Sequence, residues 1–96
     1  MPNLKKIQSL VEELELEKGF SRDINNKCFR LMQETVELED AIKSGNKKKI
    51  AEECADCIHF LGSILGQIGV DGDKEFMKKY NKNKKRFKGK GLDNFK

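Results

Sequence analysis

Apolar side chains recur every three or four residues along most of this chain, beginning with Leu4, Ile7, Val11 and Leu14. Residues at this spacing lie on one side of an α-helix, so each such stretch predicts an amphipathic helix. The chain has one Pro, no Trp and few runs of β-branched residues, which makes a β-sheet unfavourable. The pattern therefore predicts an all-α fold.

Local signals predict where the first three helices begin and end. The first should end near Lys18, with Gly19 as its C-cap, and Ser21 should cap the second. Gly45 should close the second helix, and Asn46 should cap the third. These signals predict short connections, which bring successive helices side by side.

A turn over residues 70–73 should lead into a fourth helix with an apolar edge at Phe76, Tyr80 and Phe87. We expect one domain over residues 1–87 and a flexible basic tail over residues 88–96.

Each helix is expected to turn an apolar stripe inward and its acids outward. On the first helix the outward residues should be Glu12, Glu13, Glu15 and Glu17. The stripe of the second helix should contain Ile24, Cys28, Leu31, Leu38 and Ile42. The stripe of the third should contain Ile50, Cys54, Ile58, Leu61, Leu65 and Ile68.

A chain of 96 residues is near the size at which a single core barely suffices, and such chains often gain stability by assembling. Gly62, Gly66 and Gly69 weaken the third helix, which indicates close approach of another backbone in a helix crossing or a subunit contact. We expect a four-helix bundle completed by homodimerisation, as a dimer or a dimer of dimers.

Two acidic pairs, Glu34-x-x-Glu37 and Glu53-x-x-Asp56, lie on the second and third helices. Residues three apart share a helix face, and the turn at residues 44–46 can bring the two faces together. Four converging carboxylates repel one another unless a divalent cation lies among them, and Mg²⁺ is the usual partner of such ligands. The alternative is that these are ordinary surface acids.

The cysteines suit a reduced compartment, and Cys54-x-x-Cys57 allows a zinc site only if Cys28 and His59 supply the other ligands. We favour thiols that pack as small apolar side chains, and a packing or surface role for His59. No stretch has the length of a membrane span or the apolar core of a signal peptide, so the expected location is cytoplasmic.

Lysines gather at two places. Lys47, Lys48 and Lys49 oppose the dipole of the third helix, and Lys49 shares a face with Glu53, so Lys49 is a candidate anion-binding residue. The alternative is a solvated run of charges. Residues 74–96 carry ten Lys or Arg against two acids, which suits either a nucleic-acid surface or a solvated face.

The combination of motifs resembles the MazG-like nucleotide pyrophosphohydrolases of the all-α NTP pyrophosphatase superfamily. The two acidic pairs are separated by 15 residues and are followed by Lys79-x-x-x-Asn83-x-x-Arg86-Phe87. The resemblance covers roughly residues 18–87 and includes Lys18-Gly19-Phe20. It implies hydrolysis of a nucleoside triphosphate to monophosphate and pyrophosphate, with Mg²⁺, or Mn²⁺ in its place.

By this resemblance, Glu34, Glu37, Glu53 and Asp56 would be the catalytic metal ligands. The substrate-binding residues would be Lys49, Phe60, Lys79, Lys82, Asn83 and Arg86. Two positions depart from the family pattern. Gln33 stands where many relatives have a glutamate, and Phe60 stands where a tyrosine is common.

We expect a Mg²⁺-dependent nucleoside triphosphate pyrophosphohydrolase that cleans the nucleotide pool. The alternatives are a phosphoribosyl-ATP pyrophosphatase and a non-catalytic basic helical module that binds nucleic acid. A membrane is not an expected partner, and nucleic acid is the less favoured one.

Overall fold

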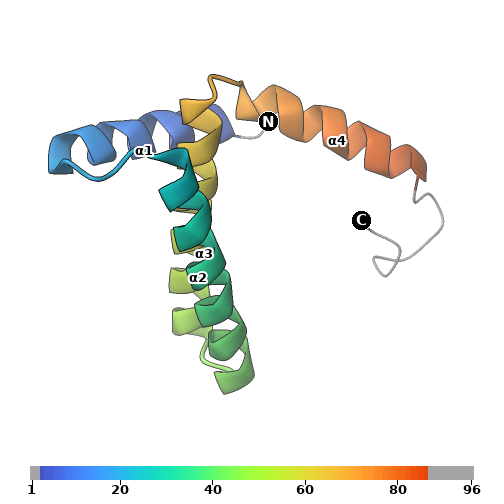
Figure 1. Cartoon of the computed structure of the whole chain (residues 1–96). Coiled ribbons are helices and arrows are strands. Elements are labelled where there is room, and N and C mark those ends of the chain that lie inside the picture. Colours follow the sequence, from blue (N-terminus) through green and yellow to red (C-terminus); the bar gives the residue numbers. More distant parts are fainter. Residues whose placement is uncertain (1–2, 87–96) are drawn as a thin grey trace.

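The computed structural model describes residues 3–86, which form four α-helices and contain no strand. The helices are α1 (Leu4–Lys18), α2 (Ile24–Ser44), α3 (Lys47–Gln67) and α4 (Gly72–Arg86). The long helices α2 and α3 form an antiparallel hairpin, α1 lies across one end of it, and α4 leads away (Figure 1). The all-α prediction is confirmed. The predicted tail and Phe87 lie outside the described residues.

The predicted helix ends are confirmed at three of four caps. Gly19 and Gly45 close α1 and α2 with φ of 67° and 73°, and the Asn46 side chain accepts a hydrogen bond from the Lys49 N–H. Ser21 as the cap of α2 was wrong. Asp23 caps this helix because it directly precedes it, and its carboxylate accepts the Asn25 N–H at 3.0 Å.

Gly62 and Gly66 let α1 cross α3 closely, which confirms the predicted helix crossing at these two positions. Gly69 lies after the end of α3, and a Cβ atom there would meet nothing within 4 Å. A Cβ atom at Gly62 would lie 3.3 Å from Ile7 Cγ2 and 3.5 Å from Val11 Cγ2. At Gly66 the nearest atom would be Gln8 Cβ at 3.9 Å. A larger side chain at Gly62 would push α1 away from the hairpin.

The hairpin packs along one edge of the predicted stripes, not along their centres. On α2 the buried or half-buried positions are Lys27, Leu31, Glu34, Leu38 and Ala41. On α3 they include Ile50, Glu53, Cys57, Phe60 and Ile64. Much of each predicted stripe stays exposed, notably Cys28, Ile42, Cys54, Ile58, Leu61 and Ile68. Two helices bury only the strip between them, and these stripes are wider than that strip.

Within the described residues, no helix is both long enough and apolar enough to span a bilayer.

Candidate metal centre

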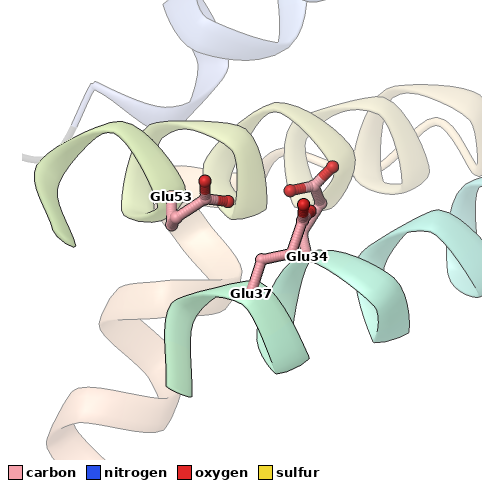
Figure 2. A group of neighbouring side chains, drawn as sticks. All are labelled: Glu34, Glu37 and Glu53. Carbon is pink, nitrogen blue, oxygen red and sulfur yellow. The ribbon is translucent and has the colours of Figure 1, made fainter. Parts of the chain in front are cut away.

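Three of the predicted carboxylates converge between α2 and α3. Glu34, Glu37 and Glu53 each offer an oxygen atom, and these atoms lie within 4.8 Å of one another. Figure 2 shows Glu34 and Glu37 rising from α2 toward Glu53 on α3. Glu34 is buried, Glu53 half-buried and Glu37 exposed, so the group opens to solvent on one side.

Asp56 is not one of the three converging carboxylates, so its part in the metal site stays a prediction. It lies one turn after Glu53 on α3 and is exposed. Its charge nevertheless helps to raise the pKa of Glu37, so it remains near the group. A fourth negative charge is better solvated in water than held among three others, which fits the exposure of Asp56.

Crowding of negative charge shows in the pKa of Glu37, which is raised above the ordinary value of 4.5. The largest cause is a hydrogen bond with Glu34, followed by the charge of Glu34. Arg30 acts in the opposite direction and lowers this pKa. The raised pKa therefore reflects negative charge crowded between these two side chains.

Two oxygens of the group have no hydrogen-bond partner among the described residues. They are Oε2 of Glu34 and Oε2 of Glu53, and both are buried. A buried, unpaired carboxylate oxygen is costly, and a divalent cation would satisfy both oxygens at once. Hard oxygen ligands of this kind suit Mg²⁺ or Mn²⁺, so the residues present fit such an ion.

The cysteines do not form a comparable site. Of the residues that the structure describes, only the three glutamates form a group of three or more potential metal ligands, which argues against the zinc alternative. Cys57 is buried, as expected for a small apolar side chain, whereas Cys28 and Cys54 are exposed. Burial is the main cause that raises the pKa of the Cys57 thiol, and the neighbouring acids add to it.

Phe60 and Arg30 border the carboxylate group. Phe60 is 9% exposed, and its ring lies 5.3 Å from the guanidinium carbon of Arg30 and 5.6 Å from Lys27 Nζ. Arg30 Nη2 lies 3.5 Å from Glu34 Oε1. Arg30 was not predicted from the sequence, although Arg30 precedes Glu34 by four residues and so shares its helix face.

The four proposed substrate residues of α4 do not gather at the carboxylates within one chain. Lys79, Lys82 and Arg86 are exposed on α4, and Asn83 is half-buried there. α4 packs against α1 and diverges from the hairpin (Figure 1). Lys49 is exposed in the first turn of α3, one turn before Glu53.

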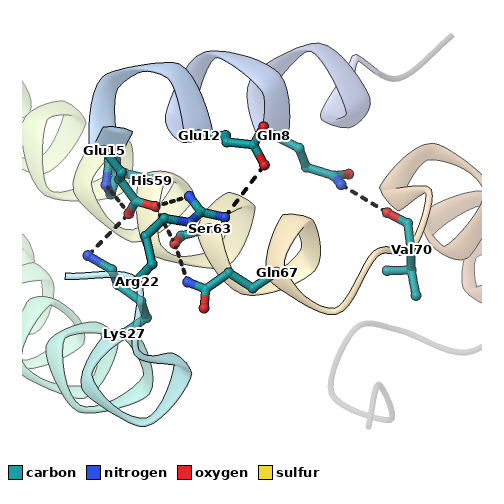
Figure 3. A network of polar contacts seen from close by, with 9 residues as sticks. All are labelled: Gln8, Glu12, Glu15, Arg22, Lys27, His59, Ser63, Gln67 and Val70. Carbon is teal, nitrogen blue, oxygen red and sulfur yellow. Dashed lines mark hydrogen bonds and ion pairs between the residues drawn. The ribbon is translucent and has the colours of Figure 1, made fainter. Parts of the chain in front are cut away.

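A second charged cluster, which the sequence did not predict, surrounds Glu15 (Figure 3). Glu15 was expected to face outward, but its side chain is 0% exposed. Its Oε1 accepts hydrogen bonds from Arg22 at 2.7 Å and from Ser63 at 2.9 Å. Its Oε2 lies 3.1 Å from Lys27 Nζ and 3.3 Å from His59 Nε2. One carboxylate therefore joins α1, α2 and α3.

The spacing of Gln8, Val11 and Glu15 was a signal that could have revealed this burial. Gln8 and Val11 are also buried, and steps of three and four residues place Glu15 on their face. His59 has a packing role, as predicted, with its ring edge-on to Phe60 at 5.0 Å between centroids.

The model of the phosphoribosyl-ATP pyrophosphohydrolase family matches residues 6–83, a range that includes both acidic pairs and the Glu15 cluster. No curated protein and no solved structure matches the chain at a significant level.

Proposed function

Because the chain belongs to the phosphoribosyl-ATP pyrophosphohydrolase family, we propose that it cleaves the α–β phosphoanhydride bond of a nucleotide triphosphate with the help of Mg²⁺. This family and the MazG-like enzymes share one all-α superfamily, so hydrolysis of a phosphoanhydride bond follows from membership. The metal and the substrate are the proposed part. The proposal of a metal rests on one observation, which is that Glu34 and Glu53 each have a buried oxygen without a hydrogen-bond partner.

The side chains of the site would have two roles, to hold the metal and to accept a proton. Glu34, Glu37 and Glu53 would hold the metal, with Asp56 moving inward once a cation offsets its charge. A bound Mg²⁺ would polarise the phosphate and lower the pKa of a water molecule. Gln33 cannot take a proton, so the proton of the attacking water would pass to a motif carboxylate or to Glu52.

Two substrate classes remain in competition. Ordinary ribo- or deoxynucleoside triphosphates would fit a role in cleaning the nucleotide pool. The family match favours phosphoribosyl-ATP as the second candidate. Both contain the same triphosphate, so the carboxylate group would serve either one. A panel of these nucleotides with Mg²⁺, scored for monophosphate and pyrophosphate, separates the two.

The metal assignment is tested by Glu53→Gln and Asp56→Asn. Each should abolish pyrophosphate release from every substrate of the panel and leave the helical circular dichroism signal intact, because a neutral amide is a poor Mg²⁺ ligand. Glu39→Gln, an exposed glutamate on α2, is the matched control and should retain activity. Full activity in either site variant would refute the assignment.

We also propose that a second copy of the chain covers the open apolar face of the hairpin. Met32 and Val36 on α2 are 62% and 58% exposed, and Leu61 on α3 is 48% exposed. Burying such side chains contributes about 25 cal/mol per Å². The same assembly would let α4 of a partner bring its cations to the carboxylates. Light scattering that gives a monomer at all concentrations would contradict this proposal.

A further inference from the structure

Arg30 lines two neighbouring hollows beside the carboxylate group. One hollow, of about 430 Å³, is bordered by Arg30, Gln33, Glu34, Val36 and Glu37. The other, of about 330 Å³, is bordered by Arg30 together with Phe20, Ser21, Asn26, Lys27, His59 and Phe60. Arg30 is the residue that these two hollows share. A ligand that is bound at the carboxylates and reaches into the second hollow would therefore pass Arg30.

Arg30 acts as a counter-ion of the carboxylate group. Its Nη2 lies 3.5 Å from Glu34 Oε1. A divalent cation bound to Glu34 would meet this positive charge at close range. Arg30 in this position opposes metal binding by like-charge repulsion.

Arg30 is also free to take a new partner. Its side chain is 48% exposed, whereas that of Lys27 is 5% exposed and paired with Glu15. The Phe60 ring lies against the guanidinium of Arg30, and this stacking contact does not fix the direction in which the guanidinium donates its hydrogen bonds. A guanidinium fits two phosphate oxygens at once, and phosphate provides negative charge to replace that of Glu34.

We infer that Arg30 is a phosphate-binding residue of this site and serves as the counter-ion of Glu34 until a metal and a polyphosphate arrive together. This inference rests on the proposed pyrophosphohydrolase function. Its consequence is positive cooperativity, because polyphosphate removes the repulsion that a metal alone must overcome.

The test compares Arg30→Met with the wild-type protein in two binding measurements. The first is binding of Mn²⁺ alone, followed by electron paramagnetic resonance. The second is calorimetric binding of pyrophosphate at saturating Mg²⁺, because pyrophosphate is the product that both candidate substrates share. Arg30→Met should bind Mn²⁺ about three- to ten-fold more tightly, since a like charge is gone. It should bind pyrophosphate about 10- to 100-fold more weakly, since a charged hydrogen bond is lost.

Two further variants sharpen the result. Lys43→Met removes a cation that also pairs with a glutamate one turn away on the same helix, Glu39, but both of these side chains are about 70% exposed. It should leave both affinities unchanged. Arg30→Lys keeps the charge without the planar fork, so it should bind Mn²⁺ like the wild type and pyrophosphate less tightly.

The inference predicts that Arg30→Met changes the two affinities in opposite directions, so that Mn²⁺ binds more tightly and pyrophosphate binds more weakly. If Arg30→Met weakens both affinities, the residue is structural, and if pyrophosphate binding is unchanged, it does not bind phosphate. Either result overturns the inference while the wild type still binds Mn²⁺ and releases pyrophosphate. A wild-type protein that does neither overturns the proposed function instead.

Discussion

Glu15→Ala should be among the most destabilising single substitutions in this chain. It leaves Lys27, whose side chain is 5% exposed, without the carboxylate that lies 3.1 Å from its Nζ. It also removes the acceptor of the Arg22 and Ser63 hydrogen bonds. Removing one partner of a buried ion pair costs about 3–5 kcal/mol, because the other charge remains buried. A domain of this size has a total stability of about 5–14 kcal/mol, so the loss is a large share of it.

Urea unfolding followed by circular dichroism measures this effect at a fixed protein concentration. Glu13→Ala is the matched control, because Glu13 is an exposed glutamate on the same helix. It should change stability by no more than about 0.5 kcal/mol. Glu15→Leu combined with Lys27→Met should recover much of the loss, because no buried charge is then unpaired. Equal costs for Glu15→Ala and Glu13→Ala would refute the reasoning.

The remaining predictions concern pH and packing. The pKa of Glu37 is raised, so the folded chain holds this proton more tightly than the unfolded chain does. The resulting stability is present below pH 4.5 and is lost as the pH rises through the raised pKa. Mn²⁺ affinity should change in the opposite direction and fall as the pH drops through the same range. Thermal melts and Mn²⁺ titrations across this range measure the two effects. Gly72→Ala should lower the free energy of unfolding by about 1–3 kcal/mol, because a Cβ atom there would clash with Gln8 Oε1 and lie 3.2 Å from Leu65 Cδ1. An unchanged midpoint of urea unfolding would contradict this prediction.

Helix content was predictable because its signals are local. Gly19, Gly45 and Asn46 cap helices through contacts within a few residues, and the sequence displays those residues directly. The Ser21 prediction failed because Asp23, two residues later, is also a good N-cap, and sequence alone does not fix where the first turn begins.

The candidate site was predictable in part for the same reason. The three-residue spacing placed Glu34 and Glu37 on one face of α2, and the short turn at residues 44–46 brought Glu53 of α3 opposite that face. Spacing could not say that Asp56, three residues further on, stays in solvent. That depends on how far one helix is rotated about its axis relative to the other.

The sequence by itself determined four amphipathic helices, their order, and the acidic pairs that they carry. Only the tertiary structure decided which edge of each stripe is buried, that Glu15 lies at the junction of three helices, and that Arg30 of α2 lies over the Phe60 ring of α3. Periodicity fixes which residues share a face of a helix. Which face meets which neighbour depends on contacts between distant residues, such as the close approach of α1 at Gly62.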